Sequence, residues 1–242
     1  LKPDTKNLQE VVVKAEKRRY VRKGNPAVEL MKRVIEAKKD TKLENHDFYT
    51  YNKYQKLSMA LNDFKVKEQD STELDKVKFS QQAELSPYTG KMVVPISLDE
   101  TVTQHIYRRD PQSEKDIIKG EQSSGLNQLF ATGDMVNTTL KEVFQDVDIY
   151  GNYVKLLKFP FLSPIGTGAT AFYRYYIVDT VLVERDSCYH LQFTPNNPQD
   201  IGFNGDIYIL KDSTLHVKKC HLSIPPKSDV NFVSTLHIDQ IY

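Results

Sequence analysis

The sequence lacks tryptophan, long apolar runs and the short motifs that mark common enzyme classes. No apolar run approaches the roughly 20 residues that a membrane-spanning helix needs, which argues against such a helix. Walker, Gly-x-Gly-x-x-Gly, His-Glu-x-x-His and Gly-x-Ser-x-Gly patterns are absent, so nucleotide, zinc-protease and serine-hydrolase chemistry have no support in the sequence. We therefore expect a protein that is not an enzyme, with no catalytic residues, no cofactor and no metal.

Charge is nearly balanced over the 242 residues, with a net charge of +1, which argues against binding to nucleic acid. Residues 1–42 nevertheless carry 13 Lys/Arg and only 6 Asp/Glu. We expect residues 1–22 to be an extended basic arm or linker and residues 23–242 to be a single α+β domain. The chain starts at Leu1 without a signal peptide, so we expect it to be a piece of a longer protein.

A strand meander between Phe172 and Ile224 organises the rest of the predicted fold. It contains the segments YRYYIVDTVLV, CYHLQF, FNGDIYIL and TLHVKKCHLSI, which are separated by turn-forming residues such as Lys211–Ser213. Apolar residues alternate with polar ones, as in strands that are buried on one face. Short polar connections favour antiparallel neighbours, because parallel strands need long crossovers.

Patterns elsewhere predict one clear helix and two long strands. Asn25 is a capping residue, Pro26 suits the first helical position, and the apolar residues after them follow a helical spacing. We expect strands over residues 48–61 and 92–107, a β-prone patch over 8–13 and a polar loop over 110–120. Further helices are expected over 126–130 and 135–144, and an irregular loop over 151–170.

The expected fold class is α+β, with a curved, largely antiparallel sheet resembling an open half-barrel. The helix at residues 26–39 and the helices at 126–145 are expected to pack on its concave face.

Aromatic residues are abundant, with 14 Tyr and 11 Phe, and they suggest one candidate site. A curved sheet covered by helices can enclose an apolar ligand. We expect such a cavity to be lined by a group of aromatic side chains, and the alternative is an ordinary filled core. The group consists of Phe161, Phe172, Tyr173, Tyr175 and Tyr176.

The two cysteines, Cys188 and Cys220, are candidates for a disulfide if their strands are neighbours. Zinc binding together with His190 and His221 is disfavoured, because consecutive residues such as Cys220 and His221 point to opposite faces of a strand. The third possibility is two buried thiols. Near Asp146, an incomplete calcium-loop pattern is better explained as a structural turn.

Several blocks of the sequence resemble one family of outer-membrane proteins of Bacteroidetes. The blocks are LQEVVVKAEKRRYVRKGNPAVELMKRVI at Leu8–Ile35, FQDVDIYGNY at Phe144–Tyr153, FLSPI at Phe161–Ile165, CYHLQF at Cys188–Phe193 and FNGD at Phe203–Asp206. That family combines an N-terminal carboxypeptidase-regulatory-like domain, a middle domain of unknown function and a C-terminal membrane β-barrel. The resemblance implies that this chain is the middle domain, on the periplasmic face of the outer membrane.

The resemblance also sets two expectations for function. The first is a non-enzymatic periplasmic module that binds an apolar ligand or lipid. The alternative is a structural spacer or protein-interaction module that links the regulatory-like domain to the barrel, which would then be its partners. The order of strands in the meander is also similar to lipoprotein carriers of the LolA/LolB kind, which implies fold more than function.

Overall fold

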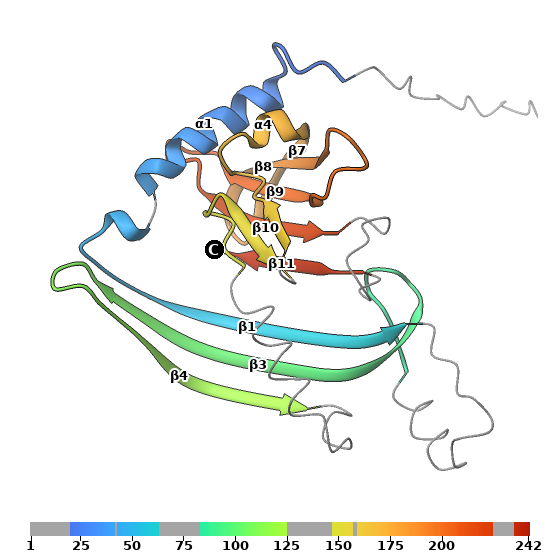
Figure 1. Ribbon diagram of the computed structural model, residues 1–242. Coiled ribbons are helices and arrows are strands. Elements are labelled where there is room, and N and C mark those ends of the chain that lie inside the picture. The colour runs from blue at the N-terminus through green and yellow to red at the C-terminus, as the bar shows by residue number, and fades with distance from the viewer. Residues whose placement is uncertain (1–19, 42, 63–82, 125–146, 157–158, 225–234) are drawn as a thin grey trace, which may run out of the picture.

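A computed structural model describes residues 20–41, 43–62, 83–124, 147–156, 159–224 and 235–242 (Figure 1). None of the described helices combines the length and the apolar character that a membrane span requires. The elements, in chain order, are α1 Pro26–Thr41, η1 Leu43–Asn45, β1 Phe48–Asn62, β2 Glu84–Leu85, β3 Met92–Arg108, β4 Ser113–Ser124, β5 Tyr153–Leu156, β6 Phe159–Leu162, α4 Ala169–Phe172, β7 Tyr173–Val183, β8 Asp186–Pro195, β9 Asn204–Leu210, β10 Val217–Ser223 and β11 His237–Ile241.

The described strands divide among three antiparallel sheets. Strands β7 to β11 form a meander in the order β11-β10-β9-β8-β7, which we call the core sheet. Strands β1 to β4 form a second sheet with β3 in the middle, which we call the long sheet, and β5 pairs with β6 as a separate hairpin. In Figure 1 the long strands curve beneath the core sheet, while α1 lies on the far side of the core sheet.

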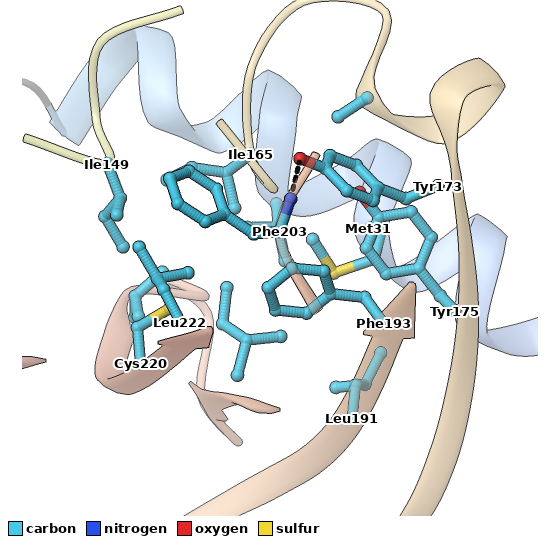
Figure 2. Packing of buried hydrophobic residues seen from close by; sticks show 14 of the residues in the cluster. Met31, Ile149, Ile165, Tyr173, Tyr175, Leu191, Phe193, Phe203, Cys220 and Leu222 are labelled. Atoms are coloured by element: carbon cyan, nitrogen blue, oxygen red, sulfur yellow. Dashed lines mark hydrogen bonds between the residues drawn. The ribbon is translucent and has the colours of Figure 1, made fainter. Parts of the chain in front are cut away.

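The hydrophobic core lies on one face of the core sheet, between that face, α1 and the β5–β6 hairpin. Alternate residues of β7, β8, β9 and β10 point into it, as one-sided burial requires. Helix α1 contributes the apolar stripe that its sequence predicts, and Met31 contacts the aromatic cluster (Figure 2). The sheet residues that are fully buried in this cluster include Tyr173, Tyr175, Leu191, Ile207, Ile209, Cys220 and Leu222.

Local sequence signals explain where several elements begin and turn. The Oδ1 atom of Asn25 accepts a hydrogen bond from the Ala27 N–H at 2.9 Å, which caps α1 as predicted. In the β9–β10 turn, Asp212 Oδ1 accepts hydrogen bonds from the N–H groups of Thr214 and Leu215 at 2.9 and 3.2 Å. These contacts confirm the predicted helix start and the predicted hairpin turn.

The predicted class, α+β with largely antiparallel sheets, is confirmed, as are the strands predicted at residues 48–61 and 92–107. Two predictions are wrong. The segment 110–120 is mostly strand β4 rather than a loop, and the segment 151–170 contains the β5–β6 hairpin and the start of α4. The β-prone patch at 8–13 and the helices predicted at 126–130 and 135–144 lie outside the described residues.

Replacing Leu191 with Ala should destabilise the protein by about 2–5 kcal/mol, because Leu191 is completely buried and the truncation leaves a cavity. Denaturant unfolding measures this change. The matched control is Leu85→Ala in β2, where the side chain is 64% exposed and a change within about 0.5 kcal/mol is expected. Equal losses in the two variants would contradict the location of the core.

Candidate functional site

The aromatic residues predicted to line an apolar cavity do not share one. Phe161, Tyr173 and Tyr175 are completely buried in the core, Phe172 is half-buried beside Tyr173, and Tyr176 is 42% exposed. Because consecutive strand residues point to opposite faces, Tyr175 and Tyr176 cannot line the same cavity. The alternative interpretation, an ordinary filled core, describes the three buried rings.

Two of these buried rings carry hydroxyl groups that the core must satisfy. Tyr173 donates to the carbonyl of Leu162 at 2.6 Å, and Tyr175 donates to the carbonyl of Pro164 at 2.7 Å. Burial raises the pKa of both phenols well above the ordinary value, so both remain neutral hydrogen-bond donors. The two hydrogen bonds attach the end of β6 and the segment that follows it to the core sheet.

The disulfide considered from the sequence is wrong, because Cys188 and Cys220 are both free and buried. Strand β9 lies between their strands, so the condition for a disulfide is not met. Cys188 pairs across the sheet with Leu210, whereas Cys220 pairs with Ile207, three residues away along β9 and on the opposite face. Burial raises the pKa of the Cys220 thiol, which keeps it protonated.

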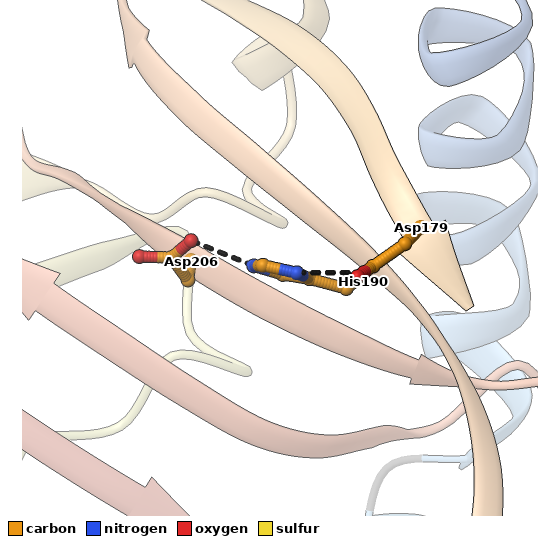
Figure 3. A network of polar contacts seen from close by, with 3 residues as sticks. All are labelled: Asp179, His190 and Asp206. Carbon is orange, nitrogen blue, oxygen red and sulfur yellow. Dashed lines mark hydrogen bonds and ion pairs between the residues drawn. The ribbon is translucent and has the colours of Figure 1, made fainter. Parts of the chain in front are cut away.

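A histidine between two carboxylates lies on the outer face of the core sheet (Figure 3). The Nδ1 atom of His190 is 3.0 Å from Asp179 Oδ1, and its Nε2 atom is 2.7 Å from Asp206 Oδ1. The ring of Tyr208 stacks on the imidazole with 4.5 Å between ring centroids. The network joins β7, β8 and β9 side by side, so it ties three strands together on the surface opposite the core.

A second aromatic and polar cluster links the long sheet to the core sheet. Tyr88, between β2 and β3, donates to Asp239 Oδ2 at 3.0 Å and stacks on His237 at 4.1 Å. His221 Nδ1 lies 2.8 Å from Asp239 Oδ1 and its ring is 5.5 Å from that of His237. We call these four residues the Tyr88 joint.

Ionisation within the Tyr88 joint is shifted by its surroundings. Burial, followed by the nearby His221, lowers the pKa of His237. Burial alone would raise the pKa of Asp239, but hydrogen bonds from His221 and Tyr88 lower it overall. Within the described part of the chain, the buried Nδ1 atom of His237 has no hydrogen-bond partner. The joint therefore favours the neutral imidazole of His237 and the ionised carboxylate of Asp239.

Metal binding finds no support in these clusters. Among the described residues, no group of three or more His, Cys, Asp or Glu side chains has the geometry to hold a metal ion. His190 and His221 are each engaged with aspartates, and Cys220 faces the core while His221 faces outward, as strand alternation predicts. The described arrangement therefore offers hydrogen bonding and aromatic contacts rather than a zinc centre.

One face of the long sheet exposes large apolar side chains beside the polar cluster of Tyr54, Lys56 and Glu100. Tyr54 and Val102 are direct cross-strand partners on that face, and they are 62% and 36% exposed. Phe48, near one end of the sheet, is 60% exposed. We call this surface the apolar face of the long sheet. Its apolar members, which the strand register places on the same side of the sheet, are Phe48, Tyr54, Leu98, Val102, Ile106 and Ile117.

The opposite face of the long sheet differs in chemistry. Tyr49, Tyr51, His105 and Tyr107 stack on one another there, with 4.7 Å between the Tyr49 and Tyr107 ring centroids. His105 Nδ1 lies 2.7 Å from Asp116 Oδ1. This face also exposes Tyr51 and Ile118, at 40% and 63%. We take the other face as the candidate interaction surface because Phe48 and Tyr54 are both more than half exposed there.

An open recess of about 370 Å³ lies beside the start of α1. Its floor is largely apolar and its rim carries three cationic side chains, one of which, Arg22, donates to the Ala171 carbonyl at 2.7 Å. The lining consists of Arg22, Lys23, Val28, Lys32, Thr170 and Ala171. None of the five residues predicted to line an apolar site belongs to it.

Comparison with known proteins identifies the family. Residues 30–242 match the model of a family of unknown function, DUF5686. The chain belongs to that family. No curated protein and no solved structure matches the chain. The family description assigns no reaction or ligand, so function must be argued from the surfaces described above.

The sequence indicated that the histidines lie in the C-terminal strands, but it did not indicate which carboxylates and aromatic rings they contact. Alternation placed His190 on a polar strand face, but Asp179 and Asp206 lie 11 and 16 residues away. Tyr88 and Asp239 are separated by 151 residues. The sequence does place Asp and His residues on the polar faces of several strands. Which of them meet can be told only once the pairing register of those strands is known.

Both thiols should be unreactive toward a thiol reagent in the native protein and should react in denaturant without any reductant. Burial blocks access, and the raised pKa of Cys220 and Cys188 suppresses the reactive thiolate. Counting modified cysteines by intact-mass measurement checks this. Absence of reactive thiols in denaturant, together with recovery after reduction, would show a disulfide instead.

Stability should fall as the pH drops below about 6.5, the ordinary pKa of His. His237 has a lowered pKa in the folded protein, so the unfolded state binds the proton more readily and acidification favours unfolding. Asp239, also lowered, adds a further loss at more acidic pH, as its carboxylate becomes protonated.

The variant His237→Phe tests this dependence, because it keeps a ring against Tyr88 but cannot titrate. Denaturant unfolding across the pH range should show a weaker loss below about pH 6.5 than in the unmodified protein. His46→Phe, at an exposed position, is the control and should keep the full pH dependence. An unchanged profile in His237→Phe would count against the role of this residue.

Proposed function

We propose that this chain is a non-enzymatic interaction module on the periplasmic face of an outer membrane. In this proposal it links a regulatory-like domain to a membrane β-barrel and contacts its partner through the apolar face of the long sheet. The location and the partners rest on the resemblance to the Bacteroidetes outer-membrane family. The choice of an interaction module over a ligand carrier rests on the geometry of the two sheets.

The exposure of the apolar face carries the proposal. An antiparallel sheet ordinarily buries its apolar face against another layer, because exposed apolar surface is costly in water. Here Phe48 and Tyr54 are both more than half exposed, and their neighbour Val102 is also accessible. Exposed apolar patches on a folded protein commonly mark contacts with another protein or a membrane.

The filled core supports a module over a carrier. An apolar ligand would need space where Phe161, Tyr173 and Tyr175 lie, yet these side chains have no exposed surface and their rings pack closely. The Phe161 and Phe203 ring centroids are 4.8 Å apart. Releasing this volume would break the tyrosine hydrogen bonds to the Leu162 and Pro164 carbonyls.

The dimensions of the long sheet also suit a connecting role. Strands β1 and β3 contain 15 and 17 residues. At about 3.3 Å per residue each strand reaches roughly 50 Å. Pairing between them along nearly their whole length, interrupted by a β-bulge at Met59/Ala60, provides an extended surface, which suits a spacer between two bodies.

Site-specific photocrosslinking in the producing cells tests the proposal. A photoreactive amino acid at position 102 should crosslink to a protein, because Val102 lies on the apolar face. Position 103 is the matched control, because Thr103 is adjacent in β3 but points to the opposite face. The double variant Phe48→Thr/Tyr54→Thr should reduce the crosslink at position 102 by about tenfold, while thermal unfolding verifies that it folds.

Two outcomes would decide against the interaction module. Equal crosslinking from positions 102 and 103 would mean that the apolar face has no special role. Native mass spectrometry of the chain, purified without detergent and then given lipid, should show the mass of the bare polypeptide. Lipid that stays bound, and that denaturation releases, would favour the lipid-binding alternative instead.

A further inference from the structure

The long sheet is attached to the rest of the molecule near each of its two ends. Near one end, a short connection through η1 leads from α1 into β1, and the side chain of Asn45 donates to the Lys39 carbonyl at 2.5 Å (Figure 1). Near the other end, the turn between β2 and β3 carries Tyr88, which contacts Asp239 and His237 of the core sheet. The Tyr88 joint is thus the attachment that lies far from α1.

The separation of the two attachments gives the long sheet the geometry of a lever. Strand β3 begins at Met92, shortly after Tyr88, and ends at Arg108, which pairs with Phe48 at the η1 end. Its 17 residues extend over roughly 50 Å at about 3.3 Å per residue. A small rotation near η1 would therefore move the Tyr88 end by a large distance, and the contacts of the Tyr88 joint oppose that movement.

The contacts at the Tyr88 end are of a kind that can break and form again. Tyr88 is 54% exposed, and it lies in a turn between two strands rather than within a strand pair. Among the described strands, no backbone pairing joins the long sheet to the core sheet. The joint therefore depends on side-chain hydrogen bonds and ring stacking, which are individually weak at a partly exposed site.

Protonation of His237 works against these contacts. The imidazolium form carries a proton on Nδ1, and this atom is buried without a hydrogen-bond partner among the described residues. The ring of His221 on β10 lies 5.5 Å away and faces the new positive charge. Asp239 on β11 attracts that charge, but burial and His221 outweigh it and lower the pKa of His237.

The other ionisable groups of the joint stay in their neutral-pH forms until the pH is lower. Asp239 is held ionised by the hydrogen bonds from His221 and Tyr88 and by the nearby Lys219, which together lower its pKa. Burial and the contact with Asp239 raise the pKa of Tyr88, so its hydroxyl remains a donor. Acidification therefore acts first on His237, because the ordinary pKa is about 6.5 for His and about 3.9 for Asp.

We propose that the Tyr88 joint is an acid-released latch, which holds the far end of the long sheet on the core sheet at neutral pH and frees it as the pH falls. Opening gives His237 access to water, so the open form binds the proton more readily than the closed form. Each decrease in pH below about 6.5 therefore shifts the population toward the open form. None of the four residues of the joint belongs to the buried cluster of the core, so the core sheet keeps its fold when the latch opens.

The distance between two spin labels tests the latch, and it requires no partner protein. Labels are attached to cysteines introduced at Lys91, beside the Tyr88 turn, and at Gln199 in the core sheet's β8–β9 loop, both exposed positions. The two native thiols are buried and leave the label to the new sites. Electron–electron resonance on samples frozen from about pH 7.5 should show one short distance. At about pH 5 the fraction with a longer distance should rise severalfold.

Two pairs of variants locate the effect in the joint. His237→Phe keeps a ring against Tyr88 but cannot be protonated, so the distance should stay short at both pH values. Its control, His216→Phe in the β9–β10 turn, should respond as the unmodified chain does. Tyr88→Ser removes both the ring and the reach to Asp239, so the longer distance should be populated already at about pH 7.5. Its control, Tyr153→Ser, changes a similarly exposed tyrosine of β5 and should keep the short distance at that pH.

Three results would overturn the proposal. The first is an unchanged distance in the unmodified chain at about pH 5, and the second is equal lengthening in the His237→Phe chain. The third is lengthening that accompanies loss of slow amide exchange in β8 and β9, which would show acid unfolding rather than release of the long sheet. Slow exchange in these two strands throughout also verifies that every variant is folded.

Discussion

The burial of aromatic rings between α1, the β5–β6 hairpin and the inner face of the core sheet is the constraint on which the rest of the structure depends. Tyr173 and Tyr175 can enter this apolar space only because their hydroxyls find the carbonyls of Leu162 and Pro164. A buried hydroxyl without a partner would cost about 1–3 kcal/mol. The end of β6 and the segment after it are therefore held by the same side chains that fill the core.

Because the core is filled, the interaction that we propose would take place on the outer surfaces of the molecule. The outer face of the core sheet is polar, and His190 joins three strands there through Asp179 and Asp206. The Tyr88 joint uses similar chemistry to connect the two sheets. Most of the carboxylates, imidazoles and phenols at these positions bond to one another, although the Nδ1 atom of His237 has no partner among the described residues. On the apolar face of the long sheet, Tyr54 donates to Glu100, while Phe48 and Val102 remain exposed.

Much of the secondary structure could be predicted, because local signals agree with the tertiary context. Helix α1 has a capping Asn25, a Pro26 at its first position and an apolar stripe, and all three features act within a few residues. Strand β4 was missed because nearly all of its side chains are exposed, so neither face shows apolar alternation. Its existence depends on pairing with β3, which is a property of the register and not of its own composition.

For the candidate site, too, the sequence predicted local features and missed those that depend on distant segments. Alternation in the sequence correctly placed Cys220 and His221 on opposite faces, because the side-chain period of a strand is a local property. The same alternation could not show that β9 separates Cys188 from Cys220, which excludes their disulfide. Nor could abundance of aromatic residues distinguish a lined cavity from a filled core, since both use the same side chains.

By itself, the sequence determined the fold class, the position of α1, the long strands and the alternation of faces within uninterrupted segments such as Cys188–Phe193. Tertiary structure alone decided which strands are neighbours, that Phe161, Tyr173 and Tyr175 fill the core, and that Tyr88 meets Asp239 across 151 residues. The physical reason is the range of the interactions. Periodicity and capping act over a few residues, whereas strand order, register and packing depend on contacts between distant segments that only the folded chain brings together.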